Sequence, residues 1–236
     1  MMNAYDYRTY LSDVLKSSGK SADEIAAYPF MNDDPKFAEY YRYHYDTDWQ
    51  KKVMDNHYLQ NVYLKVTGGD NVAKYALSLN YLKNQGALNA TKLGRYNTRF
   101  NADLNLSKRL TSSINLSFSL NEQELKNQGI QPTTNPIYLG LVKAPFLHSY
   151  DVSSDGIESP DLADRDIFNV SNPAAVIGLM QARNQNYRFL GGVSFLYKLS
   201  NSFDLGATIG INFDKIKENS FVPLKGVVSD TLTNAI

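Results

Sequence analysis

The sequence predicts an all-β protein, a portion of an antiparallel transmembrane β-barrel with about six long strands. Three observations support this fold class. Hydrophobic and polar residues alternate in six stretches, these stretches are long, and their hydrophobic phase carries no charge before Lys83 at the very end of one stretch. An N-terminal helical or irregular segment and a long loop that carries short helices complete the predicted architecture.

The expected division of the chain follows from where the alternation begins. Residues 1–56 are polar and rich in aromatic residues. Their first part, "YDYRTYLSDVLKSSGKSADEIAAYPF", predicts a short helix and then a second helix that ends before Pro29. A further helical turn is expected around 49–54. We therefore expect a helical or irregular loop segment at 1–56 and a partial outer-membrane barrel at 57–236.

From residue 59 onward, hydrophobic residues recur at every second position, which is the period of a β-strand. The stretch "RYNTRFNADLNLS" shows this clearly, since one phase is hydrophobic apart from Thr98 and the other is wholly polar. A helical interpretation of this stretch leaves Ala102 and Leu106 unexplained. The five other stretches alternate in the same way and do not fit a helix either. The six alternating stretches are 61–67, 73–83, 95–107, 112–121, 187–199 and 203–214.

The connections between the predicted strands also differ in length. "GGDN", "KRLT" and "NS" are tight turns, whereas "NQGALNATKLG" is longer and residues 122–186 form a long extracellular loop in this interpretation. Short turns at one end and long loops at the other are typical of outer-membrane barrels. Two Asn-Pro pairs in the long loop, at 135–136 and 172–173, each precede a hydrophobic run. Asn at the cap and Pro at the first helical position predict two short helices there.

A soluble antiparallel sheet, with one face on a core and one in water, is the alternative interpretation. The predicted strands are about twice as long as the average globular strand of about five to six residues. Seven charged residues within the strands fall in the polar phase: Lys65, Arg99, Asp103, Arg188, Lys198, Asp204 and Asp214. These two features favour the barrel.

Aromatic residues bracket the hydrophobic runs in a way that suits a membrane. Tyr187 and Tyr197 stand at the two ends of one run, and Phe203 and Phe213 stand at the ends of another. A strand segment of about ten residues, tilted by about 45°, climbs roughly 23 Å. The lipid-facing band of a barrel, with its aromatic girdles, is about 25 Å tall. Ordinary core packing is the other explanation of these aromatic residues.

Composition excludes several classes of protein. The 24 basic residues balance the 24 acidic ones, so no net charge favours nucleic acid or an anionic membrane surface. The chain has no cysteine, and therefore no disulfide framework and no thiolate chemistry. No window approaches the ~20 apolar residues of a membrane-spanning helix, and "MMNAYDYRTYLSDV" does not have the pattern of a signal peptide. A search for long apolar windows does not detect membrane-spanning strands, because these are hydrophobic only at alternate positions.

Six strands are too few to close a membrane barrel, because the smallest have eight. An open sheet in lipid would leave unpaired backbone groups at its edges, each at a cost of several kcal/mol. We therefore expect this sequence to supply an interior portion of a larger barrel.

Five segments of the sequence resemble the SusC/RagA family of TonB-dependent outer-membrane transporters. In chain order they are "YDTDWQKKV", "QNVYLKVTGGDNVAKYALSLNYLKNQGAL", "RYNTRFNADLNLSKRL", "TTNPIYLGLVKAPFLHSYD" and "DGIESPDLADRDIFNVSNPAAVI". Each segment alone is a loose match, but their order and spacing together are fairly specific. The resemblance extends from about residue 40 to 217.

This resemblance implies a 22-stranded barrel with an N-terminal plug, energised through TonB. It also implies a SusD-like surface lipoprotein as partner, a glycan or peptide as substrate, and a place in the outer membrane in contact with lipid. We expect no nucleic-acid partner and no cofactor. A TonB box, a plug and an aromatic C-terminal strand are not recognisable, so an internal portion of such a barrel is expected.

No catalytic set and no metal-ligand spacing is visible, so we expect no enzyme and no bound metal. The three histidines, His44, His57 and His148, are scattered, and we expect them in loops or at the surface. The loop "DVSSDGIES" has some features of a calcium loop. Calcium loops of that kind carry a bidentate Glu at position twelve, where this sequence has Leu162. A solvated acidic loop is the expected structure.

The phase of the strands assigns each side chain to one of two faces. Polar residues with tyrosine suit ligands rich in hydroxyl groups, and equally suit packing against a plug. The candidate lumen-facing, substrate-binding residues are Tyr63, Arg99, Asn101, Asp103 and Asn105. The candidate lipid-facing residues are Tyr96, Phe100, Leu104, Leu106, Tyr187, Tyr197, Phe203 and Phe213.

Two functions from different classes follow. The first is part of a TonB-dependent transporter that imports a nutrient, with an oligosaccharide as the favoured substrate. The second is a soluble or surface β-rich module that holds carbohydrate through its 17 tyrosines.

Overall fold

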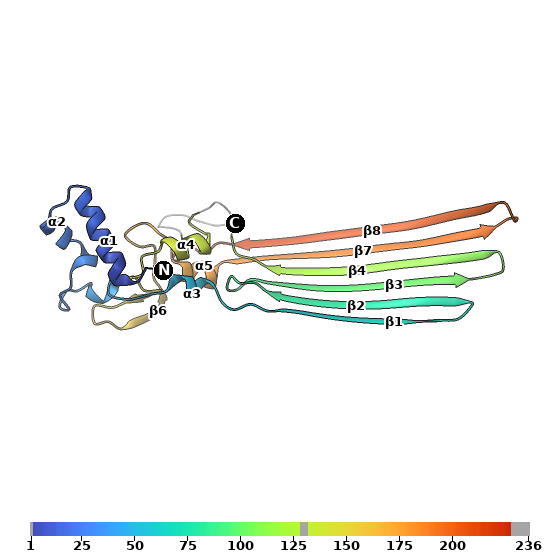
Figure 1. The fold of residues 1–236 in the computed structure, drawn as a ribbon, viewed down its shortest axis with the longest axis horizontal. Coiled ribbons are helices and arrows are strands. Elements are labelled where there is room, and N and C mark those ends of the chain that lie inside the picture. The colour runs from blue at the N-terminus through green and yellow to red at the C-terminus, as the bar shows by residue number, and fades with distance from the viewer. Residues whose placement is uncertain (1, 128–131, 228–236) are drawn as a thin grey trace.

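Six long strands form one antiparallel sheet in the computed structural model, which describes residues 2–127 and 132–227 (Figure 1). Each strand pairs with the next long strand along the chain, in the order β1-β2-β3-β4-β7-β8. The predicted antiparallel fold class is confirmed. The strands are β1 (Leu59–Gly69), β2 (Ala73–Gln85), β3 (Lys92–Asn105), β4 (Leu110–Glu124), β7 (Gln181–Lys198) and β8 (Asp204–Phe221).

Most of these strands are longer than the alternating stretches in the sequence. β7 begins at Gln181 rather than at 187, and β8 continues to Phe221 rather than ending at 214. The additional residues are mostly polar on both faces, as in "QARNQN", so hydrophobic alternation does not reveal them. Backbone pairing nevertheless continues there, with Gln181 opposite Phe221.

The strand connections have the predicted asymmetry. At one end of the sheet, short turns join β1 to β2, β3 to β4 and β7 to β8. At the other end, residues 86–91 join β2 to β3, and the long excursion at 125–180 joins β4 to β7. The sheet therefore has a tight end and an elaborated end.

A head of short elements lies at the elaborated end (Figure 1), built from residues 2–56, 132–180 and 222–227. The predicted helices at the N-terminus, around residue 49 and after both Asn-Pro pairs are confirmed. A short hairpin, β5 with β6, was not predicted. The elements of the head are α1 (Ala4–Ser17), α2 (Ala22–Ala26), η1 (Pro29–Met31), η2 (Tyr40–Arg42), α3 (Trp49–Val53), α4 (Pro136–Val142), β5 (Tyr150–Val152), β6 (Glu158–Leu162) and α5 (Pro173–Leu179).

Two small hydrophobic clusters hold the head together. In the first, Trp49 and Phe146 are fully buried, and the Trp49 indole nitrogen donates a hydrogen bond to the carbonyl oxygen of Ala144 at 2.9 Å. In the second, α4 meets α5 through Leu139 and Val176. The N-terminal segment and the long excursion therefore form one packed unit.

Asparagine caps explain why both helices of the excursion begin where they do. The Asn135 side chain accepts hydrogen bonds from the backbone N–H groups of Ile137 and Tyr138, at 3.0 and 3.1 Å. The Asn172 side chain accepts one from Ala174 at 3.0 Å, and its amide donates to the carbonyl oxygens of Ser149 and Ala163. These side chains satisfy N–H groups that a helix start leaves unpaired.

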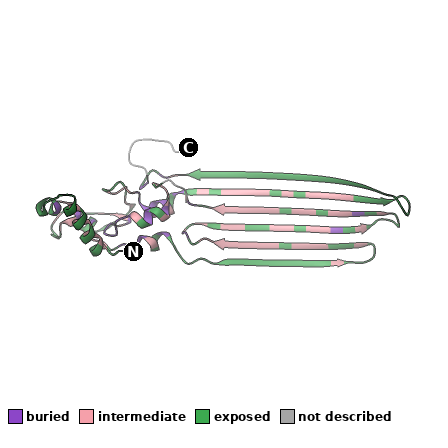
Figure 2. Cartoon of the chain, turned by 45° about the horizontal axis from the view of Figure 1, so that its top comes forward, coloured by how far each residue is buried: buried purple, intermediate pink, exposed green. Residues whose placement is uncertain are grey.

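The sheet is a single open layer (Figure 2). Among the residues of the six long strands, all of which the structure describes, only Ala102 and Ser112 are buried. The described part of the chain therefore leaves both faces uncovered. None of the helices in the described ranges has both the length and the apolar content needed to cross a membrane.

Candidate functional site

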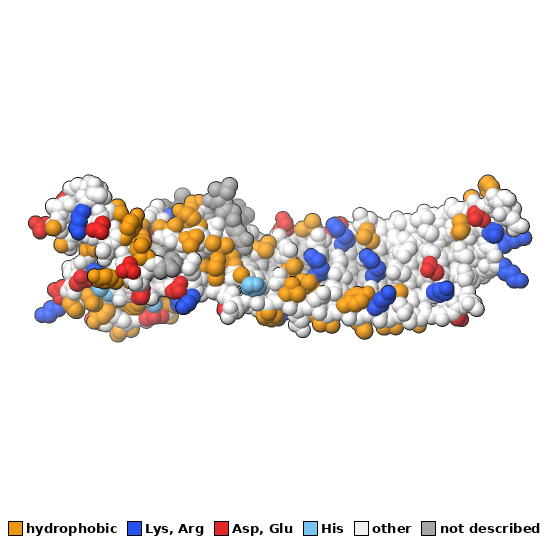
Figure 3. Space-filling view, in the orientation of Figure 1, with side chains coloured by type: hydrophobic (Ala, Val, Ile, Leu, Met, Phe, Trp, Pro, Cys, Tyr) orange, Lys and Arg blue, Asp and Glu red, His pale blue; other side chains and the backbone are white. Residues whose placement is uncertain are grey.

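The strand register divides the sheet into a hydrophobic face and a polar face. We define the polar face by the row that runs from Tyr63 through Asn80, Asn97 and Ser119 to Arg188, together with the parallel rows in the same phase. Figure 3 shows a mainly polar surface over the strands, whereas hydrophobic side chains gather over the head. The opposite phase makes up the hydrophobic face.

The five candidate substrate-binding residues all lie on the polar face, in two places. Four follow one another at alternate positions of β3, and the register sets Arg99 opposite Ser78 and Ser117. Tyr63 lies two strands away on β1, opposite Asn80, and is 60% exposed. The structure therefore groups Arg99, Asn101, Asp103 and Asn105 and leaves Tyr63 apart.

Hydrogen bonds occupy two of these four β3 side chains. The Ser113 hydroxyl donates to a carboxylate oxygen of Asp103 at 2.7 Å. The Asn105 amide donates to the carbonyl oxygen of Asn71 at 2.7 Å. Arg99 is different, because its guanidinium forms no hydrogen bond or ion pair within residues 2–127 and 132–227.

An open groove of about 570 Å³ lies beside Arg99 on the polar face. Its lining includes Gly192 on β7 and Gly210 on β8, which stand directly opposite each other. A Cβ added at either glycine would meet its nearest atom at 3.9 or 3.8 Å, which is ordinary contact. A larger side chain would therefore fit at either position. Because glycine has no side chain, the pair leaves a hollow in the surface. The polar side chains around the hollow are Arg99, Asn101, Asn115, Ser117 and Asn212.

Sequence reasoning missed three polar residues of this groove, Asn115, Ser117 and Asn212, as well as the glycine pair. Their polar phase was visible, but which of them stand beside Arg99 depends on register. Gly192 and Gly210 both fall in the polar phase of their strands. Two glycines in that phase, on consecutive strands joined by a short turn, are the sequence signal that could have located the hollow.

The hydrophobic face carries a row of tyrosines across the sheet. Tyr81 on β2 stands opposite Tyr96 on β3, with ring centroids 4.9 Å apart, and Tyr96 in turn stands opposite Leu120. Leu120 is followed in the row by Tyr187 on β7. The candidate lipid-facing residues Tyr96, Phe100, Leu104, Tyr187, Tyr197 and Phe213 all belong to this face.

Two further candidates of the same group lie outside the strands. Phe203 precedes β8 by one residue, and its carbonyl oxygen accepts turn hydrogen bonds from the backbone N–H groups of Leu199 and Ser200. Leu106 follows the last residue of β3. Both are more than half exposed, and both lie at the tight end of the sheet.

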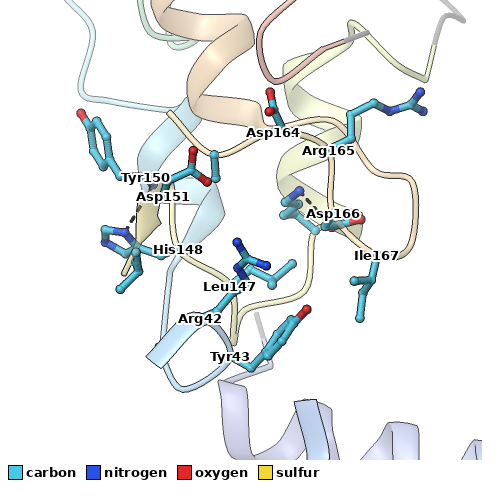
Figure 4. Close-up of a pocket in the computed structure, with 13 residues that line it drawn as sticks. Arg42, Tyr43, Leu147, His148, Tyr150, Asp151, Asp164, Arg165, Asp166 and Ile167 are labelled. Atoms are coloured by element: carbon cyan, nitrogen blue, oxygen red, sulfur yellow. Dashed lines mark hydrogen bonds and ion pairs between the residues drawn. The ribbon is translucent and has the colours of Figure 1, made fainter. Parts of the chain in front are cut away.

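The head contains a separate cavity of about 210 Å³ (Figure 4). Its lining comes from three places: Arg42 and Tyr43, the segment from Leu147 to Val152, and the segment from Ala163 to Ile167, together with Lys143. The Lys143 ammonium and the Asp166 carboxylate form an ion pair at 2.9 Å with both side chains almost fully buried. Burial lowers the pKa of Lys143, while Asp166 opposes that effect.

Ion pairs within the head account for most charges around this cavity. Arg42 pairs with Glu39 at 3.3 Å, and the ammonium of Lys225 lies 3.0 Å from Asp164. Asp151, the first residue of the calcium-like loop, also faces Lys225, at 3.4 Å. In the described part of the chain no group of three or more His, Cys, Asp or Glu residues is arranged to hold a metal ion. This arrangement is that of a packed, internally paired structure.

The prediction that the histidines lie in loops or at the surface is confirmed, but two of the three imidazoles are largely covered. His44 and His148 lie in loops as expected, but their side chains are only 14% and 16% exposed. His44 stacks on the ring of Tyr40 at 3.8 Å, and His148 stacks on Tyr45 at 4.2 Å. The tyrosine-rich head covers these imidazoles, and this packing could not be foreseen from their positions in polar sequence.

Comparison with known proteins supports the family resemblance. No family model matches the chain. Over 199 residues, or 83% of the chain, it is 26% identical to TonB-dependent receptor P26 of Formosa agariphila. It is also 30% identical over 71 residues to TonB-dependent receptor P3 of the same organism. The chain resembles part of a TonB-dependent receptor.

Solved structures show the same fold. The RagAB peptide transporter matches 97% of the chain with a TM-score of 0.66 at 16% sequence identity. The RagAB peptide importer in its open-open state matches 93% with a TM-score of 0.67 at 14% identity. The predicted resemblance to a RagA-like TonB-dependent receptor is thus confirmed. The chain spans 18% of receptor P26 and 27% of the matched transporter chain. The proteins it matches are named receptors, transporters and importers.

Proposed function

We propose that this chain forms part of the wall of a TonB-dependent outer-membrane transporter that imports a nutrient. The observation that carries the proposal is the two-faced sheet. One face is charge-free from the tyrosine row of Tyr81, Tyr96 and Tyr187 to Tyr197 near the tight end, except for Lys215 on the edge strand. The other face is polar and contains the groove beside Arg99. Lipid on the first face and an aqueous lumen on the second fit this division.

The soluble alternative, a β-rich carbohydrate-binding or adhesion module, has less support. A soluble sheet of this size needs a second layer over its hydrophobic face. In the described part of the chain the head packs at one end of the sheet and covers neither face (Figures 1 and 2). Residues such as Ile209 and Ile211 remain 66% and 64% exposed.

The polar side chains of the groove suit either a substrate or a plug as the group that fills it. Asparagine and serine side chains donate to and accept from hydroxyl groups, which supports our favoured substrate, an oligosaccharide. They serve the backbone of a peptide equally well, and matched solved structures include a peptide transporter and a peptide importer. Arg99, which has no hydrogen-bond or ion-pair partner among the described residues, adds affinity for a carboxylate. A carboxylate on a plug is the competing occupant.

Partners belong to the same proposal. A SusD-like surface lipoprotein would meet the transporter on the side of the head, and TonB would act through another part of the whole protein. Affinity purification of the complete transporter from outer membranes would test both. Recovery of a surface lipoprotein with it supports the proposal, and its consistent absence would contradict that part.

Cysteine labelling tests the assignment of the two faces. Because the chain has no cysteine, Leu116→Cys and Ser117→Cys each introduce a single thiol. These neighbours on β4 lie on opposite faces, Leu116 beside Phe100 and Ser117 beside Arg99. In lipid vesicles, a water-soluble maleimide should label the variant at 117 and spare the one at 116. Equal labelling of both, or a chain that stays compact and soluble without detergent, would contradict the proposal.

A further inference from the structure

The hydrophobic face changes from apolar to charged immediately on the head side of the tyrosine row. One step toward the head from Tyr81, Tyr96 and Tyr187, the register places Lys83, Gly94, Glu122, Gln185 and Lys217 in line. One step further stand Lys92, Glu124 and Arg183. Two strand residues at about 3.3 Å each, tilted by about 45°, place the first charged row roughly 5 Å beyond the tyrosines.

Basic side chains outnumber acidic ones in this region. We call the five basic residues the basic belt: Lys83, Lys92, Arg183, Lys215 and Lys217. The two carboxylates are already engaged, since Lys92 pairs with Glu124 at 2.8 Å and Arg183 pairs with Glu122 at 3.2 Å. Gln185 also donates a hydrogen bond to Glu122 at 2.6 Å.

Three cations of the basic belt remain available. Lys83, Lys215 and Lys217 form no ion pair within the described residues. The ammonium of Lys83 lies 5.6 Å from the centre of the Tyr58 ring, so this cation contacts an aromatic ring but no carboxylate in the part of the chain that the structure describes. The chain as a whole has no net charge, so this excess is local.

A cavity of about 270 Å³ opens on the belt. Tyr81 and Tyr96 line it toward the apolar band. The charged residues that line it are Lys83, Lys92 and Arg183, together with Glu122 and Glu124, which are paired with Arg183 and Lys92. Gly94 lies between Lys83 and Glu122 in the row, and a Cβ there would meet only a Tyr96 ring atom at 4.0 Å. The space above Gly94 is therefore open to a ligand.

We propose that the basic belt binds the phosphate group of an anionic lipid in the leaflet on the head side of the membrane. The inference rests on the proposed membrane barrel. Tyrosines mark the depth of the membrane interface, and lipid phosphates lie just beyond it. Ammonium groups at that depth form charge-assisted hydrogen bonds with phosphate. Lys83 and the cavity above Gly94 provide one contact point, and Lys217 extends the belt to β8.

Vesicle flotation of the full chain tests this inference. The chain is refolded with vesicles of phosphatidylcholine alone, or of phosphatidylcholine mixed with phosphatidic acid, and the fraction that floats is measured against lipid concentration. We expect tighter association with the mixed vesicles. In the double variant Lys83→Gln, Lys217→Gln, the gain in affinity for the mixed vesicles should be about tenfold smaller. The matched control, Lys65→Gln with Lys198→Gln on the polar face, should keep it.

The outcomes separate the two proposals. Association with neutral vesicles and an equal gain for wild type and belt variant would overturn the inference alone, as would no gain from phosphatidic acid. Failure to associate with either kind of vesicle would overturn the inference. Equal labelling at positions 116 and 117 in the associated chain would overturn the proposed membrane barrel and this inference with it. Fluorescence of Trp49, the single tryptophan, reports whether the head of each variant is folded.

Discussion

The head and the sheet of this protein are stabilised in opposite ways. The head buries Trp49 and Phe146 completely and pairs its charges internally. The sheet leaves every residue of β8 exposed and buries only Ala102 and Ser112 among its six long strands. Hydrophobic burial within the chain therefore stabilises the head, whereas the sheet depends on backbone pairing and on what surrounds it. Substitutions in the two regions should respond differently to the solvent.

Removing the central side chain of the head should have the largest effect. Trp49→Ala creates a cavity and leaves the carbonyl oxygen of Ala144 without its donor, so we expect a loss of about 3 to 5 kcal/mol. Hydrogen exchange of head amides measures it. Ile209→Ala on the exposed sheet is the matched control, with an expected change within about 0.5 kcal/mol in water. Similar losses for both would abolish the distinction between the regions.

The buried ion pair should be nearly as important. Lys143→Met leaves Asp166 charged and almost fully buried, and we expect a loss of about 3 kcal/mol or more. The Lys225 side chain, which pairs with Asp164, is 43% exposed, so Lys225→Met should cost less than about 1 kcal/mol. Urea titrations followed by Trp49 fluorescence compare the two variants. A smaller loss for Lys143→Met than for Lys225→Met would contradict burial as the cause.

The same lysine predicts a pH dependence. Because burial lowers its pKa below the ordinary 10.5, the unfolded chain binds more protons than the folded one between the two values. The stability contributed by this group is therefore fully present above about pH 10.5 and is lost as the pH falls through the lowered pKa. Wild type should show this pH dependence relative to Lys143→Met, and parallel pH profiles would contradict it.

Charge on the sheet should matter only in lipid. Leu116→Arg places a cation near the middle of the hydrophobic band and should lower stability in vesicles by about 2 to 4 kcal/mol. Ser117→Arg, the neighbour on the polar face, should change it by less than about 1 kcal/mol. Refolding from urea into phosphatidylcholine vesicles measures both. Equal costs would indicate that the faces do not differ in solvent.

The two regions were also unequally predictable from sequence. The phase of each strand is a local property, so Arg99 and Phe100 were assigned to opposite faces from alternation alone. The groove beside Arg99 required the register of four strands, because Gly192 and Gly210 become neighbours only through pairing. The head depends on contacts such as Trp49 with Ala144, which lie 95 residues apart. Local patterns carry no information about such partners, and the covering of His44 and His148 was missed for that reason.

The smallest expected effect is at the surface of the head, where Asp33 joins α1 to the loop that carries His44. Its carboxylate accepts hydrogen bonds from His44 at 3.0 Å and from Arg8 at 2.6 Å, and these lower its pKa. The stabilisation is thus present above the ordinary value of 3.8 and is lost as the pH falls through the lowered value.

Because the Asp33 side chain is 75% exposed, Asp33→Asn should cost less than about 1 kcal/mol. Hydrogen exchange of α1 amides against pH measures this cost, and the variant should lose the acid-dependent opening of the helix. Asp13→Asn, which removes only a surface pair with Lys16 at 3.5 Å, should keep it. If α1 opened identically in both variants, packing of Tyr7 and Leu11 on the first hydrophobic cluster would hold the helix without help from Asp33. Even the N-terminal helix of the head would then be held by hydrophobic burial, which the exposed sheet lacks within the described part of the chain.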